Sequence, residues 1–395
     1  MSTIKVDGIR SNSASSDAIT LASDGTCTAN ITNKPNRNLV INGAMQVAQR
    51  GTSSVSQGYT TVDRFRSINF GVDEGPTREQ ADVATGTTPY ELGFRKSFKT
   101  TNGNNTNGAG SSDYYMLRTT LEAQDIANSG WNYTSATSHV TLQFWVKSSV
   151  AQNFYGHIRS IDGTGQRYAF ETGSLSANTW TKVTKTIPGN SNLQFDNDAN
   201  EGLHITIFPF FGTDYTDSSV SLNTWGAYVG GTQTPDNTST WYTTNDATFE
   251  ITGVQLEVGS VATDFEHRSF AQELALCRRY AIVWKSKNKV RDYIIPAKVE
   301  DSDDANTAYE TSVQMRSTPS IVISSADHIK LNYTGGNQNG PVNFATRTYD
   351  DQYENRLFIN MDLNSAVLTS GDMVFLAFTN STATGTGTFT LDAEL

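Results

Sequence analysis

Apolar and polar residues alternate over several short stretches of this chain. In the stretch HVTLQFWVKSS, residues 139–149, one face collects the apolar side chains of Val140, Leu142, Phe144 and Val146. This period of two is typical of a strand with one buried face. Similar stretches, each bounded by turn residues, occupy 153–172, 179–187, 203–212 and 247–258, and the first of these is expected to be a hairpin turning at 162–165. We therefore predict an all-β fold, with a jelly-roll β-sandwich over residues 37–266.

One segment follows a helical period instead. Within residues 268–284, apolar or small side chains recur at helical spacing as Phe270, Leu274, Cys277 and Ala281. Ser269 is the expected N-cap, with Asp264 and Glu266 nearby. We predict a linking helix within 267–284. Further strand-like stretches at 291–299, 311–325, 356–364, 372–379 and 386–395 predict a second, smaller β-domain over 285–395.

The first 36 residues contain only short apolar runs, IKVDGI and AITLAS, separated by Ser, Asn, Asp and Gly. Such a segment can bury little surface by itself. We predict an extended N-terminal arm, residues 1–36, that needs a partner to be ordered.

Composition excludes several classes of function. Of the 395 residues 36% are hydrophobic and 17% charged, and the formal net charge is −11, so a nucleic-acid partner is not expected. The N-terminus lacks the apolar core of a secretory signal and no stretch has the roughly 18 to 20 apolar residues of a membrane helix. Synthesis in a cytoplasm without membrane insertion is the expectation. Cys27 and Cys277 are far apart in the sequence and are expected to be free thiols.

Several strings of the chain resemble a large family of tailed-phage virion proteins described as tail fibres or tail-fibre-like. They are DAITLASDGTCTANIT, NLVINGAMQVAQRGTSS with GYTTVDRF, FWVKSS, Trp180 with KVTKTIPG, ITGVQLEVGSVATDFEHRSFAQELALCRRY and MRSTPSIVIS, in this order. The chain departs from the family where Ala281 follows RRY in place of an aromatic residue.

The resemblance implies a sandwich like those of carbohydrate-binding modules, a linking helix and a C-terminal β-domain. It also implies a virion component, a homotrimer or other oligomer, an arm that attaches to another virion protein, and contact with the host surface. The most favoured function is a non-enzymatic tail fibre or adhesin that contacts host-surface glycan. A head decoration or head fibre, and a glycan-degrading tailspike, remain as alternatives.

Aromatic side chains in polar surroundings are the candidates for glycan contact. Sugar rings present apolar C–H faces to an aromatic ring, while amides and carboxylates bind the hydroxyls. The alternative for each residue is a place in the core or in a subunit interface. The candidates are Trp131, Tyr133, Trp225, Tyr228, Trp241 and Tyr242.

The stretch around the predicted helix is dense in opposite charges. These residues are expected to form a charge-assisted network, which suits a mechanical junction or a trimer interface better than a reactive pocket. The members of this predicted network are Glu257, Glu266, Arg268, Glu273, Arg278 and Arg279.

Signals for catalysis are few. The chain has no GxSxG, Walker or HExxH motif. A hydrolytic pair of carboxylates could be sought among Glu250, Glu257, Asp264 and Glu266, but Glu250 is expected on a solvated strand face and the others in the junction. We therefore predict no enzymatic activity.

One acidic loop begins like a calcium-binding loop. Asp196, Asp198 and Asn200 fall at the first, third and fifth positions of an EF-hand pattern, but Glu201 and Ile207 break the pattern where Gly and Glu are required. An Asx-rich turn is the favoured interpretation, calcium is the alternative, and no other cofactor is expected.

Overall fold

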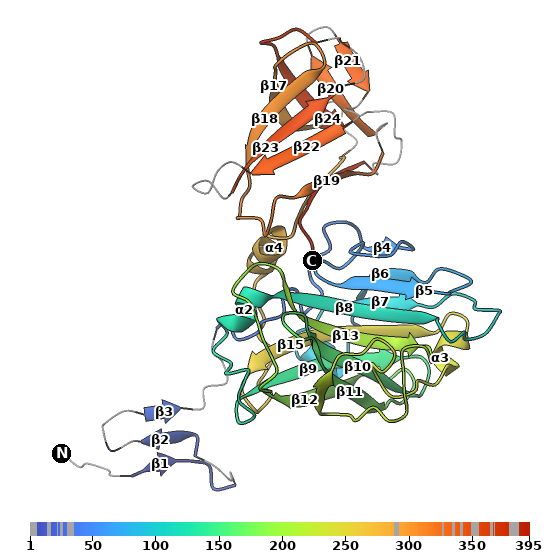
Figure 1. Ribbon diagram of the computed structural model, residues 1–395, viewed down its shortest axis with the longest axis vertical. Helices are drawn as coiled ribbons and strands as arrows, with labels where there is room; N and C mark the ends of the chain where they lie inside the picture. The colour runs from blue at the N-terminus through green and yellow to red at the C-terminus, as the bar shows by residue number, and fades with distance from the viewer. Residues whose placement is uncertain are drawn as a thin grey trace.

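The computed structural model (Figure 1) describes residues 6–13, 17–21, 23, 27–29, 35–287, 292–325, 328–333, 336–339, 343–348, 355–363, 366, 368–378 and 387–395. These residues form a small N-terminal sheet, a large β-sandwich and a C-terminal β-domain. The predicted all-β fold class is confirmed.

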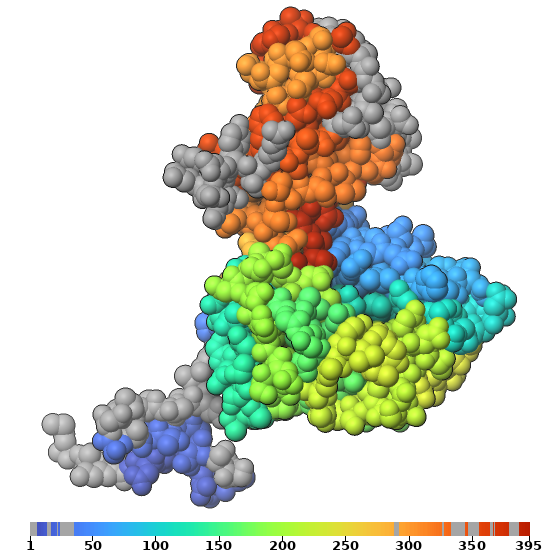
Figure 2. Space-filling view, viewed as in Figure 1, coloured from blue at the N-terminus to red at the C-terminus, as the bar shows by residue number. Residues whose placement is uncertain are grey.

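The N-terminal sheet contains β1 (Gly8–Ile9), β2 (Ile19–Leu21) and β3 (Cys27–Ala29), paired antiparallel. It lies to one side of the sandwich (Figures 1 and 2), and among the described residues no hydrogen bond or ion pair joins it to the rest of the chain. Ile9 is 52% exposed and Leu21 is 39% exposed. The described part of the arm therefore displays apolar side chains that it does not bury itself.

Two six-stranded antiparallel sheets form the sandwich. The strands of the first sheet lie in the order β14 (Trp225–Ala227), β11 (Gln166–Ser174), β10 (Asn153–Ser160), β13 (Glu201–Phe211), β8 (Tyr114–Glu122) and β5 (Arg66–Phe70). Those of the second lie in the order β12 (Thr181–Pro188), β9 (His139–Ser148), β15 (Thr248–Val258), β7 (Lys96–Thr101), β6 (Thr77–Asp82) and β4 (Ser53–Ser54). The predicted hairpin is β10–β11, and strands also form in the other predicted stretches.

The core of the sandwich lies between the two sheets. The four apolar residues of β9, from Val140 to Val146, are buried there as predicted, opposite residues such as Ile158 and Ile205 of the first sheet. The other face of β9 is not solvated, because Thr141 and Gln143 are also buried. They donate to the carbonyls of Gly259 at 2.8 Å and Thr263 at 2.7 Å, so the chain that leaves β15 covers this face.

The linking helix is shorter than predicted. The helix α4 (Phe270–Arg278) begins at Ser269, whose capping box with Gln272 confirms the predicted N-cap. It ends before Ala281, because Ala281–Lys285 form strand β16 and pair with β25. The predicted helical extent to 284 and the predicted domain boundary at 285 are therefore wrong by a few residues. The β-branched side chains Ile282 and Val283 favour this pairing.

Short helices that the sequence did not indicate are α1 (Thr88–Glu91), α2 (Ala123–Ala127) and α3 (Thr240–Thr243). None of the helices formed by the described residues combines the length and the apolar character needed to cross a membrane. Cys277 is a buried free thiol, as predicted, and burial raises its pKa. The side chain of Cys27 lies outside the described residues.

The C-terminal domain packs a small sheet against a larger one. The small sheet has the order β16, β25 (Thr388–Asp392) and β19 (Ser320–Ile323). The larger sheet has the order β21 (Gly336–Asn339), β20 (Ile329–Tyr333), β24 (Met373–Phe378), β17 (Tyr293–Val299), β18 (Asp304–Glu310), β23 (Arg356–Asp362) and β22 (Asn343–Thr348). Leu391 and Ile359 meet in a core separate from that of the sandwich. In Figure 1, α4 and the C-terminus lie between the two domains.

Candidate functional site

A groove of about 460 Å³ opens at the side of the sandwich where β14 forms the edge of the first sheet. Its lining contains one indole ring and several amide side chains. The lining residues are Thr164, Gln166, Asn190, Asn192, Gln194, Trp225, Gly226 and Ala227.

Trp225 is held in one orientation within this groove. Its indole Nε1 donates to the carbonyl of Pro188 at 2.7 Å, and its ring centroid lies 5.4 Å from that of Tyr168. Trp225 and Tyr168 are also direct partners in the β14–β11 pairing. The ring remains half-buried. Because its polar atom is already satisfied, the exposed part of the ring offers an apolar surface.

Of the amides, Gln166 lies on β11, and the others come from the connection between β12 and β13. Gly189 lets this segment approach the chain near Tyr133, since a Cβ at Gly189 would lie 2.5 Å from the Tyr133 carbonyl oxygen. The next residue, Asn190, donates its backbone N–H to the same carbonyl at 2.7 Å, and its side chain accepts from Asn192 N–H at 2.9 Å. Leu193 is buried in the core, which anchors the segment. The amides are thus fixed near Trp225.

These lining groups suit a neutral polyhydroxylated ligand. An amide can donate to one hydroxyl and accept from another, while the indole packs on an apolar face of a sugar ring. The residues that line the groove include no carboxylate, whereas glycoside hydrolysis requires a pair of them. The chemistry of this lining therefore fits contacts with hydroxyl groups better than hydrolysis.

The structure sorts the six predicted aromatic residues into two groups. Trp131, Trp241 and Tyr242 are buried in the sandwich core, so their prediction as glycan-contacting residues is wrong. Their polar atoms are satisfied internally: Trp131 donates to Ser138, Trp241 donates to Thr248, and Tyr242 donates to Asp113.

The other three predicted residues remain half-buried. Trp225 lines the groove. Tyr133 does not line the groove, and its ring lies 5.0 Å from that of Phe195. Tyr228 lies beneath the guanidinium of Arg159, at 3.5 Å, and faces a different surface. The groove amides were missed because a polar segment between two strands is typical of any loop; only its position beside Trp225 distinguishes it.

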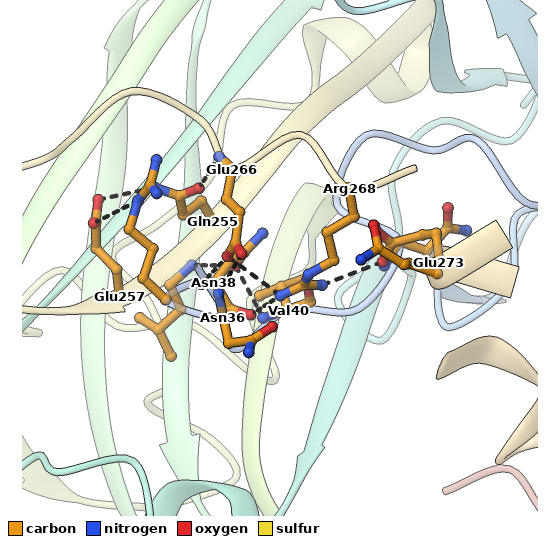
Figure 3. A network of polar contacts seen from close by, with 12 residues as sticks. Asn36, Asn38, Val40, Gln255, Glu257, Glu266, Arg268 and Glu273 are labelled. Carbon is orange, nitrogen blue, oxygen red and sulfur yellow. Dashed lines mark hydrogen bonds and ion pairs between the residues drawn. The ribbon is translucent and has the colours of Figure 1, made fainter. Parts of the chain in front are cut away.

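The predicted junction network is present around Arg268 (Figure 3). Arg268 lies 3.5 Å from the carboxylate of Glu266 and 3.4 Å from that of Glu273, and it donates to the carbonyl of Asn38. Glu266 accepts the backbone N–H groups of Asn36 and Asn38. The segment between β15 and α4 therefore binds the chain at Asn36 and Asn38, where the predicted arm enters the sandwich.

Three predicted members of the network have other surroundings. Glu257 is buried, lies 3.7 Å from Arg37, and accepts from Thr263. Arg279 pairs with Glu122, a residue that the sequence did not single out. The Nε of Arg278 is buried without a hydrogen-bond partner among the described residues. The predicted network is therefore several separate sets of contacts, one around Arg268, one between Glu257 and Arg37, and one between Arg279 and Glu122.

A cavity of about 770 Å³ adjoins this junction and is lined in part by Glu266, Arg268 and Leu276. Both carboxylate oxygens of Glu266 already accept backbone N–H groups, so this acid is committed to structure. Glu250 is not on a solvated face as predicted: it is 6% exposed and lies 2.9 Å from Lys147. The sequence did not show that Lys147 would cover it.

The calcium candidates lie together in an Asx-rich turn. Asp198 accepts the backbone and side-chain N–H groups of Asn200 at 3.0 and 2.6 Å, and Asp196 N–H donates to Asp162 at 2.9 Å. No cluster of potential metal ligands occurs among the described residues. Calcium binding at this loop stays an untested alternative to the favoured Asx-rich turn.

Two histidines are buried on the face of the first sheet that points away from the core. Burial keeps the pKa of His157 well below its usual value, and the charges of Arg118, His204, Arg159 and Arg167 lower it further. Burial also lowers the pKa of His204. The folded protein therefore favours both rings in the neutral form at pH 7.

These depressed pKa values predict acid sensitivity. As the pH falls through about 6.5, the unfolded state binds protons that the folded state does not, so stability present above this pH is lost below it. Urea unfolding should show the free energy of unfolding falling by up to about 1.4 kcal/mol per pH unit for each histidine. The variant His157→Phe should show a shallower fall, and an identical slope in the two proteins would contradict the assignment.

Comparisons with known proteins give distant structural likenesses only. No protein-family model and no curated protein sequence matches the chain. The enzymatically active domain of bacteriophage CBA120 tailspike protein 4 is similar with a TM-score of 0.30 and 14% identity, over 58% of this chain and 24% of that one. A structure described as "CBM4 structure and function" is similar with a TM-score of 0.28 and 13% identity, over 55% of this chain and 98% of that one.

The N-terminal cellulose-binding domain of Cellulomonas fimi β-1,4-glucanase C has a TM-score of 0.25 and 10% identity, over 55% of this chain and 99% of that one. At these identities and TM-scores, the likenesses are too distant to bear on what this chain binds.

Proposed function

We propose that this protein is a non-enzymatic adhesin that binds glycan through the groove around Trp225. The observation that carries the proposal is the arrangement of the groove: a half-buried indole with its N–H already satisfied faces a segment of amides, and the lining includes no carboxylate. Such a lining combines an apolar platform with donors and acceptors for hydroxyls.

We propose further that the protein belongs to a phage virion, as a tail fibre or tail-fibre-like homotrimer. Support comes from the resemblance of its sequence strings to tail-fibre-like proteins. It also comes from the N-terminal sheet, whose exposed Ile9 and Leu21 provide an apolar surface for another virion protein. The adhesin contacts a glycan of the host surface.

Replacement of Trp225 by alanine tests the groove. A screen of the purified protein against bacterial surface polysaccharides identifies a ligand, and titration calorimetry then compares variants on that ligand. We expect Trp225→Ala to weaken binding by about tenfold or more, because loss of an aromatic contact with a buried ligand face commonly costs 1.4 kcal/mol or more.

The matched control is Trp180→Ala. Trp180 is also half-buried, but it precedes β12 in the other sheet and contacts Lys147, with the ammonium 5.0 Å from the ring centroid. Its replacement should leave the affinity within about twofold of the parent. Equal affinities for the parent and Trp225→Ala would exclude this groove as the binding site.

Immunogold electron microscopy of intact phage particles tests the placement. Antibody raised against residues 38–395 should label the tail or its fibres. Label spread over the head would contradict the tail-fibre assignment and favour a head decoration.

A further inference from the structure

Arginine and histidine side chains form two rows across the outer face of the first sandwich sheet. Within each row, neighbouring residues pair directly between adjacent strands. The first row is Arg66, Arg118, Thr206 and His157, and the second is Thr120, His204, Arg159 and Arg167. They alternate with core residues such as Leu117, Ile158 and Ile205, so they lie on the face directed away from the core.

This face holds more positive charge than its own acids balance. Arg66 is directly opposite Arg118, and Arg159 is directly opposite Arg167, although like charges in such positions are destabilising. Burial lowers the pKa of Arg118, and Arg66 and Arg159 lower it further, while Glu201 is the carboxylate that opposes them. In a chain of net charge −11, this concentration of cations is exceptional.

Buried polar atoms on the same face lack partners. Among the described residues, neither ring nitrogen of His157 or His204 has a hydrogen bond, and the same holds for the Nε atoms of Arg159 and Arg167. His157 is 1% exposed and His204 is 3% exposed. Glu201 Oε2 lies 3.3 Å from His204 Nε2, so this carboxylate is an ion-pair partner available to the His204 ring. Buried polar groups without hydrogen-bond partners lower the stability of the fold, and such groups are typical of binding sites.

Three arginines of this face are not fully buried. Arg66, Arg118 and Arg159 are half-buried, so part of each side chain reaches solvent. Arg118 uses its Nε for Thr206 at 3.2 Å and its Nη2 for the sulfur of Met116 at 3.5 Å. The guanidinium fork matches the paired oxygens of a carboxylate, sulfate or phosphate group.

Aromatic rings border the arginines on the same face. Phe70 lies on β5 four residues beyond Arg66, is 56% exposed, and pairs with Tyr114, the ring centroids being 6.1 Å apart. An exposed ring on the same face as the cations suits a ligand with both apolar C–H surface and negative charge. An acidic sugar has both.

We propose that this outer face binds the anionic groups of an acidic polysaccharide, with Arg118 at the centre and Arg66 and Arg159 on either side. The choice of a polysaccharide rests on the proposed function, whereas the anion site rests on the arginines and histidines. The protein would then bind the charged groups of a glycan at the sheet face and its hydroxyl groups in the Trp225 groove.

Calorimetric titration with oligogalacturonate, and with the same oligosaccharide after reduction of its carboxylates to alcohols, tests the proposal. The parent should bind the acidic form at least about tenfold more tightly than the reduced form, a difference of about 1.4 kcal/mol, and added salt should weaken only the acidic form. Dextran sulfate and poly(glycerol phosphate), each with an uncharged counterpart, show which anion is preferred. Equal affinity for the charged and uncharged forms in all three arms overturns the proposal.

The variant Arg118→Gln should lose about tenfold in affinity for the preferred acidic ligand and nothing for its uncharged form. Its melting temperature should not fall, because the substitution relieves the repulsion with Arg66. Arg66→Gln removes a cation that makes no hydrogen bond or ion pair among the described residues, and it provides a second test if Arg118→Gln does not fold. Lys182→Gln is the matched control, because it removes the same charge from β12 in the other sheet.

The two proposals fail in different ways. If the Arg118→Gln and Arg66→Gln variants bind the acidic ligand like the parent while Trp225→Ala does not, the sheet-face site is wrong and the groove stands. If only the arginine variants lose binding, the groove is wrong and the anion site stands. Binding of single-stranded DNA as tight as that of the acidic oligosaccharide, with the same loss in Arg118→Gln, would overturn the assignment to a polysaccharide.

Discussion

Replacing Glu394 by alanine is expected to lower the free energy of unfolding by about 3 to 5 kcal/mol, because it leaves a buried cation without its partner. The side chain of Arg64 is 2% exposed and pairs with Glu394, which also lies 3.1 Å from Arg50. Burial disfavours the Arg64 cation, but the Glu394 carboxylate raises its pKa. Urea unfolding of the full chain at pH 7 measures the change.

Two further variants define what the Glu394 measurement means. Glu300→Ala removes a carboxylate from an exposed pair with Lys298, at 3.6 Å, and should cost no more than about 1 kcal/mol. The double variant Arg64→Met, Glu394→Leu replaces the pair by apolar side chains and should recover much of the loss. A loss for Glu394→Ala no larger than that for Glu300→Ala would show that the C-terminus does not depend on this contact.

Replacing Glu122 by alanine should have a similarly large effect, about 3 to 5 kcal/mol, at the other connection between the domains. Glu122 is fully buried at the end of β8, accepts two bonds of 2.7 Å from Arg279, and accepts the Tyr280 hydroxyl at 2.5 Å. Its loss leaves a guanidinium and a phenol without their acceptor. Differential scanning calorimetry should show a lower melting temperature.

The pH dependence supplies an internal check on Glu122. Burial alone would raise its pKa, but hydrogen bonds from Arg279 and Tyr280 lower it below the usual value. The stability that Glu122 contributes is therefore present above about pH 4.5 and lost as the pH falls through the lower folded-state pKa. Glu79→Ala, which removes a partly exposed partner of Lys99, is the control and should change stability by less than about 1 kcal/mol. Equal melting temperatures for the two variants would contradict the role given to Glu122.

Local patterns in the sequence were sufficient to locate most strands. The alternation in β9 identifies the side chains that face the core, because every second side chain points there. The end of α4 was harder to predict, because Ala281–Lys285 pair with β25 more than a hundred residues later. A helical pattern in the sequence carries no information on such a distant partner.

The candidate site shows the same division between local and distant information. Trp225 was identified from its polar surroundings, but so were Trp131 and Trp241, which the structure buries. The alternation of His157 and Arg159 with apolar residues is visible in the sequence, yet only the order of the strands brings them next to Arg118. Sites assembled across strands depend on a topology that alternation does not encode.

Fluorine NMR of the protein labelled with 5-fluorotryptophan tests the proposed glycan binding most directly. The chain contains six tryptophans, and single Trp→Phe variants assign their resonances. Addition of the glycan ligand should shift the Trp225 resonance and leave those of the buried Trp131 and Trp241 in place. If the ligand binds at saturation while the Trp225 resonance does not move, the groove is not the glycan site.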